Sequence, residues 1–151
     1  MQSDVNFLNG KWNSIKHLSL TSSAPVYLYR MSLSTNLNIY KKIGKIFHPG
    51  VCHGDDLGYL FKTVLTPKHL SPVEKEGIKR FTKLWTNFAK SGDPNPIEKN
   101  DLINITWNPA WKDELNYLDI GENLTVGVNP DARRMKFWNE IYTMKDTNAK
   151  L

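Results

Sequence analysis

The chain has very little cysteine and no long hydrophobic run, and each absence excludes a class of protein. It contains one cysteine, Cys52, which excludes an internal disulfide framework. No apolar stretch approaches the ~18 residues that a membrane-spanning helix needs, so we expect no membrane span. The first residues, MQSDVNFLNGKW, lack a basic segment followed by an apolar run. No secretory signal is therefore predicted, and the compartment of the protein is left open.

What the sequence does contain is typical of a folded globular protein. Apolar residues make up 40% of the chain, with five tryptophans, six tyrosines and six phenylalanines, unlike the composition of disordered chains. A chain of 151 residues has the length of one domain and is long enough for a sizeable core. Its 20 basic and 15 acidic residues are intermixed, and the net charge of +5 favours solubility rather than a particular partner.

The densest basic segment is Lys41-Lys42-Ile43-Gly44-Lys45, and it has the aromatic neighbours Tyr40 and Phe47. Basic residues interleaved with aromatic ones are a feature of nucleic-acid-binding surfaces. The segment carries no signature of a nucleic-acid-binding module, however. We therefore interpret it as a solvated loop and expect no nucleic-acid partner.

The hydrophobic pattern of the first third predicts a helix, a strand and a loop. Residues 1–24 have apolar positions at loosely helical spacing and end in a Ser/Thr-rich turn, which predicts a weak helix followed by a break. Residues 25–33, PVYLYRMSL, begin with proline and are rich in aromatic residues, which predicts a largely buried strand. Residues 34–50 are rich in Asn, Lys and Gly and predict a long loop, a type of segment that often carries function.

Two aspartates, Asp55 and Asp56, directly follow the glycine-flanked His53. Their carboxylates fit the first turn of a helix, where negative charge complements the positive helix end. The apolar residues that follow them predict a helix that includes Leu57, Leu60, Phe61 and Val64.

The strongest helix signal begins at Ser71-Pro72-Val73-Glu74, which has the form of a capping box with proline at the first helical position. Gly92 is predicted to end this helix. Its apolar face contains Ile78, Phe81, Leu84, Trp85 and Phe88.

A strand and a final helix are predicted in the last third. Residues 115–120 alternate between apolar and polar and end at Gly121, which predicts a strand. Asn129-Pro130-Asp131 is predicted to cap the last helix. The apolar face of that helix contains Met135, Trp138, Ile141 and Tyr142.

Several side chains near His53 have the chemistry of metal ligands or nucleophiles, namely those of His48, Cys52, His53, Asp55 and Asp56. Structural zinc sites use ligands in spaced pairs, and the adjacent Cys52 and His53 do not easily direct both side chains at one ion. We therefore expect no metal ion and no other cofactor. A nucleophilic Cys52–His53 pair is also disfavoured, because such pairs form in space and not between sequence neighbours. The thiol is interpreted as a small buried side chain.

Six blocks of sequence carry a resemblance to a known family. They are PVYLYRMS (25–32), PGVCHGDDLGYLF (49–61), LWTNFAKSGDPNP (84–96), ITWNP (105–109), ELNYLDI (114–120) and RMKFWNEIY (134–142). In this order they resemble the C-terminal portion of the carboxylesterase type B family, and within it the insect α-esterases, relatives of the cholinesterases and juvenile hormone esterases. The resemblance covers residues 24–142, and we expect residues 1–151 to be one C-terminal fragment of a carboxylesterase domain.

The resemblance implies an α/β fold, the C-terminal part of an α/β-hydrolase with a mostly parallel sheet flanked by helices, incomplete in this chain. It also implies that His53 is the general base of a Ser–His–Glu/Asp triad. The order of that triad along the chain, serine, then acid, then histidine, agrees with a histidine that is followed by helix, strand and helix. Asp56 matches a position at which cholinesterase-like relatives carry an acidic residue beyond the triad itself. The alternative, that Asp55 and Asp56 only complement a helix end, stays open.

The sequence departs from the family pattern because it lacks the nucleophile. None of the nine glycines belongs to a G-x-S-x-G turn, and an HGGG-type oxyanion motif is also absent. We therefore expect a carboxylic-ester hydrolase fragment that carries the catalytic histidine, lacks the nucleophile and the acid, and is inactive alone. In the complete protein its partner would be a small-molecule ester substrate. The alternative is a non-catalytic esterase-like module that binds a hydrophobic ligand or a protein.

Overall fold

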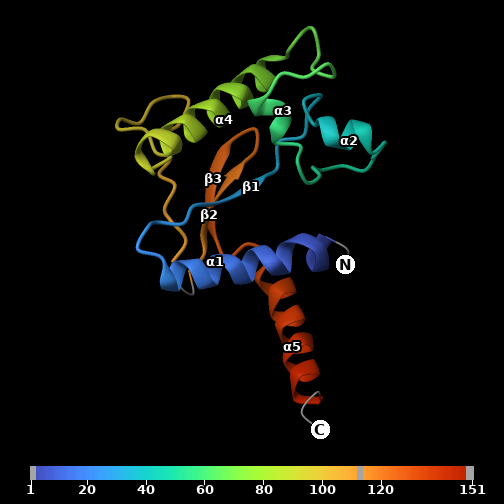
Figure 1. The fold of residues 1–151 in the computed structure, drawn as a ribbon. Coiled ribbons are helices and arrows are strands. Elements are labelled where there is room, and N and C mark those ends of the chain that lie inside the picture. The colour runs from blue at the N-terminus through green and yellow to red at the C-terminus, as the bar shows by residue number, and fades with distance from the viewer. Residues whose placement is uncertain (1–2, 112–113, 149–151) are drawn as a thin grey trace. The chain divides into compact units, whose positions relative to one another are not determined.

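The computed structural model of the protein describes residues 3–111 and 114–148. Its elements, in chain order, are the π-helix η1 (Asp4–Leu8), α1 (Asn9–Thr21), β1 (Leu28–Met31), α2 (Ile39–Ile43), α3 (Leu57–Leu60), α4 (Pro72–Ser91), β2 (Asn116–Ile120), β3 (Leu124–Val128) and α5 (Ala132–Asn148) (Figure 1). The three strands form one sheet in the order β1-β2-β3. The chain divides into two compact units. The first lies within Met1–Leu28, Asn108–Tyr117 and Gly127–Leu151, and the second within Tyr29–Trp107 and Leu118–Val126.

The first unit packs α1 and α5 around a cluster of apolar side chains. The buried members of the cluster are Trp12, Leu28, Ala110, Leu115, Met135 and Trp138. Asp4 is buried next to them and accepts hydrogen bonds from Trp138 Nε1 at 3.2 Å and from Arg134 Nε at 3.3 Å. These donors compensate the cost of burying a carboxylate. The predicted first and last helices are thus confirmed, and a buried charge joins them.

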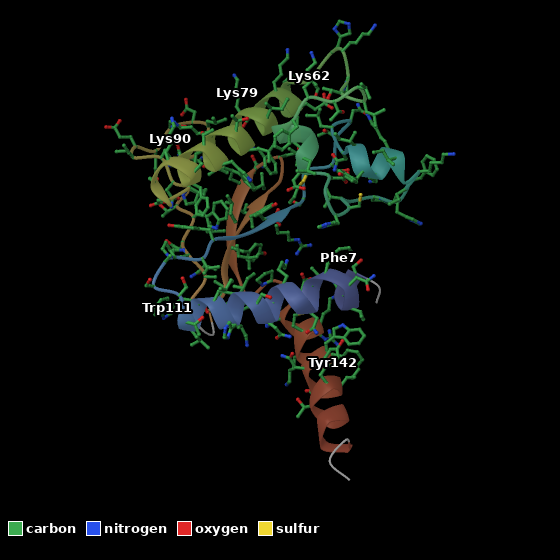
Figure 2. The ribbon with its side chains drawn as sticks, in the orientation of Figure 1. Phe7, Lys62, Lys79, Lys90, Trp111 and Tyr142 are labelled. Carbon is green, nitrogen blue, oxygen red and sulfur yellow. The ribbon has the colours of Figure 1, made fainter. Side chains whose placement is uncertain are left out.

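The helix predicted from the capping box is α4. Ser71 Oγ accepts the N–H of Glu74 at 3.2 Å, and Glu74 Oε2 accepts the N–H of Ser71 at 2.8 Å. Gly92 ends the helix in the left-handed conformation with φ +74°, which costs glycine no Cβ clash. The predicted apolar face is buried at Phe81 and Leu84, while Lys79 points away from the strands (Figure 2).

Arg80 of α4 is buried although its sequence gives no signal for burial. Its Nη1 donates to the carbonyl of Glu122 at 2.6 Å and its Nε to the carbonyl of Leu102 at 3.3 Å. It also forms an ion pair with Glu76. The guanidinium therefore fastens α4 to the turn between β2 and β3, because its fork of donors reaches backbone carbonyls on two segments at once.

The strands agree with prediction in part. The strand predicted for residues 115–120 is confirmed as β2. The first strand is shorter than predicted, because only Leu28–Met31 pairs continuously and Val26 forms an isolated bridge to Ala110. Strand β3 was not predicted. It follows β2 after a three-residue turn. Its sequence, LTVGV, alternates apolar residues with threonine and glycine, but only its first residue, Leu124, is buried.

The predicted loop of residues 34–50 contains the short helix α2, and this part of the prediction is wrong. Helix α2 follows Asn38 and begins with Ile39, which is buried. The Asn38 side chain accepts the N–H of Thr35 at 2.7 Å and donates to the carbonyl of Leu33 at 3.2 Å. These bonds fold the preceding backbone into a turn, and a polar composition alone does not reveal them.

The helix predicted after His53 is a single turn, α3, and its predicted extension to Val64 is also wrong. Phe61 is already extended, with φ −129° and ψ 132°, and Val64 is 99% exposed. Without a surface on which to bury Phe61 and Val64, the apolar spacing gives no stabilisation to a longer helix.

Gly58 of α3 lies against the backbone of Leu37, and a Cβ at Gly58 would overlap the Leu37 carbonyl oxygen. We expect Gly58→Ala to lower the free energy of unfolding by about 1–3 kcal/mol, the usual cost of overpacking. Gly10→Ala in α1 is the control, because no atom lies within 4 Å of its added Cβ, and alanine favours a helix by about 1 kcal/mol. Denaturant unfolding of the two variants measures the difference. Equal stability of the two would contradict the packing at Gly58.

Candidate active site

His53 lies in a tight turn, residues 52–57, which we call the histidine turn. The N–H of Asp55 donates to the Cys52 carbonyl at 3.1 Å, and the N–H of Leu57 donates to the Gly54 carbonyl at 3.1 Å. Gly54 has φ +87°, a conformation that glycine adopts without strain. His53 itself is exposed. The turn therefore holds an accessible imidazole on a backbone that is closed by its own hydrogen bonds.

The carboxylate of Asp55 is the buried centre of this turn, with no exposed surface. Its Oδ2 accepts the N–H of Cys52 at 2.8 Å and Asn38 Nδ2 at 3.1 Å, and its Oδ1 accepts the N–H of Lys41 at 3.0 Å. Asp55 therefore joins the histidine turn to α2, and the two lie beside each other in Figure 1. The interpretation of Asp55 as a charge that complements a helix end is wrong, because its carboxylate faces these donors.

The protonation of Asp55 follows from its surroundings. Burial of the carboxyl group disfavours the charged form, but the hydrogen bonds from Cys52, Lys41 and Asn38 favour that form more strongly. The pKa of Asp55 therefore lies below its ordinary value. The carboxylate is ionised at neutral pH and acts only as an acceptor.

A chain of polar side chains continues from Asn38 towards α4. Asn38 Oδ1 accepts Tyr59 Oη at 3.2 Å, and Tyr59 Oη lies 2.8 Å from Thr35 Oγ1. Glu74 Oε1, from the capping box, accepts the N–H of Asn36 at 3.0 Å. Among the described residues, no buried side-chain nitrogen or oxygen lacks a partner. The network thus satisfies its own members, and through Glu74 it joins the segment before α2 to the start of α4.

Asp56 has a different partner from its neighbour. Its Oδ2 accepts the hydroxyl of Tyr29 at 2.7 Å, and its side chain forms no capping bond to α3. The Tyr29 ring packs edge-on against Trp85, with ring centroids 4.9 Å apart, and against Trp107 at 6.4 Å. Burial of Tyr29 and its bond to Asp56 raise the pKa of the phenol above its ordinary value. The protonated hydroxyl therefore remains a donor, and Asp56 connects the histidine turn to β1.

Cys52 does not have the properties of a nucleophile. Burial, together with the adjacent Asp55 carboxylate, raises the pKa of its thiol to about 11, whereas reactive cysteines have lowered values. In the described part of the chain, no three His, Cys, Asp or Glu side chains are arranged to hold a metal ion. None of the described helices is long and apolar enough to cross a membrane.

The arrangement of the elements matches part of an α/β-hydrolase. Juvenile hormone esterase from Manduca sexta, solved with OTFP covalently attached, superimposes with a TM-score of 0.72 at 23% identity, over 91% of this chain and 26% of that one. An esterase from Clostridium hathewayi superimposes with a TM-score of 0.62 at 20% identity, over 83% of this chain and 23% of that one. These likenesses confirm the predicted fold class.

Sequence comparison identifies the family. The model of the carboxylesterase family matches residues 1–138. Bile salt-activated lipase of Mus musculus is 35% identical over 136 residues, which are 87% of this chain and 22% of the relative. A pyrethroid hydrolase of Mus musculus is 30% identical over 131 residues, 85% of this chain and 22% of the relative. The chain belongs to the carboxylesterase family, as predicted, and spans about a fifth of the length of these relatives.

The lowered pKa of Asp55 makes stability depend on pH. Its ionised form favours the folded state at pH values above its ordinary pKa, and this contribution is lost as the pH falls through the lower pKa of the folded state. We expect the free energy of unfolding to fall as the pH drops below about 4, and Asp55→Asn to be less stable at neutral pH with a shallower acid decline. Urea unfolding across pH measures both. An unchanged acid decline in the variant would contradict the hydrogen bonds of Asp55.

Proposed function

We propose that this chain is the histidine-bearing part of a carboxylic-ester hydrolase and that His53 is its general base and acid. The observation that supports this most directly is an exposed histidine on a turn whose adjoining backbone is tied to a fully buried carboxylate. In a member of the carboxylesterase family, such a turn offers an accessible imidazole that is held at a fixed position. Rigid support of an accessible side chain is what catalysis requires of a base.

The proposed chemistry is acyl transfer through an enzyme ester. His53 takes the proton of a serine hydroxyl as the serine oxygen attacks the ester carbonyl, and it then gives that proton to the departing alcohol. In the second half, His53 takes a proton from water, the hydroxide oxygen attacks the acyl-enzyme, and the proton returns to the serine as the acid leaves. The 151 residues contain no G-x-S-x-G turn and no HGGG-type motif, so the serine, the oxyanion donors and the carboxylate that orients the imidazole are proposed to come from another part of the enzyme. The substrate in the complete enzyme is a small-molecule ester.

Asp56 is proposed to act indirectly, as the residue that holds the C-terminal side of the histidine turn. The hydrogen bond from Tyr29 Oη supports this role, because it joins the turn to β1. The edge-on packing of Tyr29 against Trp85 fixes the donor itself. Asp56 therefore needs no contact with the substrate.

The 151-residue chain alone is expected to show no esterase turnover. Loss of the nucleophile costs on the order of 10⁶-fold in kcat in a comparable triad enzyme, and the chain contains no G-x-S-x-G turn to supply one. The measurement is hydrolysis of a naphthyl ester by the purified chain, and the control is the same chain with His53→Ala. Turnover that disappears in the control would show that the chain contains a complete active site of another kind.

Joining the chain to the nucleophile-bearing part of a relative, such as mouse bile salt-activated lipase, tests His53 directly. We expect the joined protein to hydrolyse naphthyl esters and His53→Ala to lower kcat by at least about 10⁴-fold. His48→Ala and His69→Ala, which remove other exposed histidines, are expected to keep kcat. Circular dichroism checks that each variant is folded. Full turnover by folded His53→Ala would reject His53 as the base and favour another histidine of the chain, His17, His48 or His69.

A further inference from the structure

We infer that Asp55 is a positioning residue for His53, because it fixes the backbone on both sides of the histidine and joins that backbone to α2. This inference rests on the proposed function, since it gives Asp55 a role through the proposed base. Asp55 touches neither substrate nor reacting atoms in this scheme. Its effect on the reaction is carried by the main chain of the histidine turn.

The donors to Asp55 are what make it suited to position a backbone. Two of them, the N–H groups of Cys52 and Lys41, belong to the main chain. Cys52 directly precedes His53, and the N–H of Asp55 itself donates back to the Cys52 carbonyl at 3.1 Å. His53 and Gly54 are thus enclosed by a ring of two hydrogen bonds between Cys52 and Asp55. A side-chain partner would fix a rotamer, whereas these bonds fix the path of the chain.

Burial strengthens this arrangement. The Asp55 side chain has no exposed surface, so water does not compete for its oxygens, and hydrogen bonds to a charged acceptor are stronger than those between neutral groups. Both oxygens are used, because Lys41 binds Oδ1 and Cys52 binds Oδ2. Asparagine has the same shape but one accepting oxygen. Asp55→Asn must therefore lose one of the two backbone bonds or place two donors against each other.

Helix α2 supports the turn from the other side. Carbon atoms of the Tyr40 ring lie 3.1–3.3 Å from the position that a Cβ would take at Gly54. Tyr40 stands between Ile39, which is buried, and Lys41, whose N–H is bound to Asp55. The carboxylate therefore holds the residue that follows His53 against the Tyr40 ring. Helix α2, which supports the turn, lies in residues 34–50, the segment that composition alone predicts to be a loop.

Glu74 provides a matched control for the loss of a buried carboxylate. It is also buried, it accepts the N–H groups of Ser71 and Asn36, and hydrogen bonds hold its pKa below the ordinary value against the opposing effect of burial. Its partners belong to the start of α4 and to the segment before α2, and neither is next to His53. Glu74→Gln should therefore lower stability without moving the imidazole.

The experiment measures kcat and KM of the joined enzyme for a naphthyl ester, at a temperature where every variant is folded. We expect Asp55→Asn to lower kcat by about 10²-fold, the usual effect of a displacement near 1 Å, and to leave KM within about two-fold. Glu74→Gln should keep kcat, and Asp55→Ala should resemble Asp55→Asn. Hydrogen exchange of the peptide that covers residues 50–56 should be at least about ten-fold faster in Asp55→Asn than in Glu74→Gln.

The outcomes separate this inference from the proposed function. If folded His53→Ala keeps its turnover, the proposed function is rejected, and the positioning role falls with it. If His53→Ala is inactive while Asp55→Asn keeps kcat, the proposed function stands and the inference is overturned. A rise in KM at constant kcat would overturn it as well, because a displaced base lowers the rate of the chemical step. Equal losses of kcat in Asp55→Asn and Glu74→Gln would assign the effect to stability and also overturn it.

Discussion

The local structure around His53 depends on the burial of one charge, the carboxylate of Asp55. An isolated ionised carboxylate in a protein interior costs several kcal/mol, so this position is stable only if donors surround it. Cys52, Lys41 and Asn38 supply them. The three donors come from separate positions along the chain. If any one of them moved away, the buried Asp55 carboxylate would lose a hydrogen bond, so the three segments are held together. The fixed turn and its attachment to α2 are consequences of this single requirement.

Buried charges join distant segments elsewhere in the chain in the same way. In the first unit, Asp4 accepts a bond from Trp138, which lies 134 residues later in the sequence. In the second unit, Arg80 donates to the Glu122 carbonyl, 42 residues later. Apolar clusters tolerate small displacements, because dispersion contacts have little directionality, whereas a buried charge requires its partners at hydrogen-bond distance. These residues therefore add specificity to a fold whose stability comes mainly from burial of apolar surface.

The two aspartates after His53 show how adjacent residues of one type acquire separate tasks. Asp55 binds backbone donors at the start of the turn and in α2, whereas Asp56 binds a single phenol on β1. Successive side chains in a tight turn point in different directions, so each carboxylate meets a different part of the fold. The proposed base is in this way supported from two sides while remaining exposed. Such a combination of access and rigidity fits a group that must exchange protons with a substrate.

The sequence by itself determined the elements whose signals are local, and family membership through six ordered blocks. Helix α4 was predicted with its cap and its end because Ser71, Glu74 and Gly92 act within one turn of the helix termini. Only the tertiary structure decided the length of α3, the helix α2 within a polar segment and the task of Asp55. Each of these depends on donors or surfaces that lie far away along the chain, and the periodicity of a short segment contains no information about them. Asp55 shows the difference most clearly. Its position before a helix predicts a charge that complements the helix end, whereas in the structure it is a buried acceptor for donors that the fold brings to it. A buried carboxylate is stable only where such donors surround it.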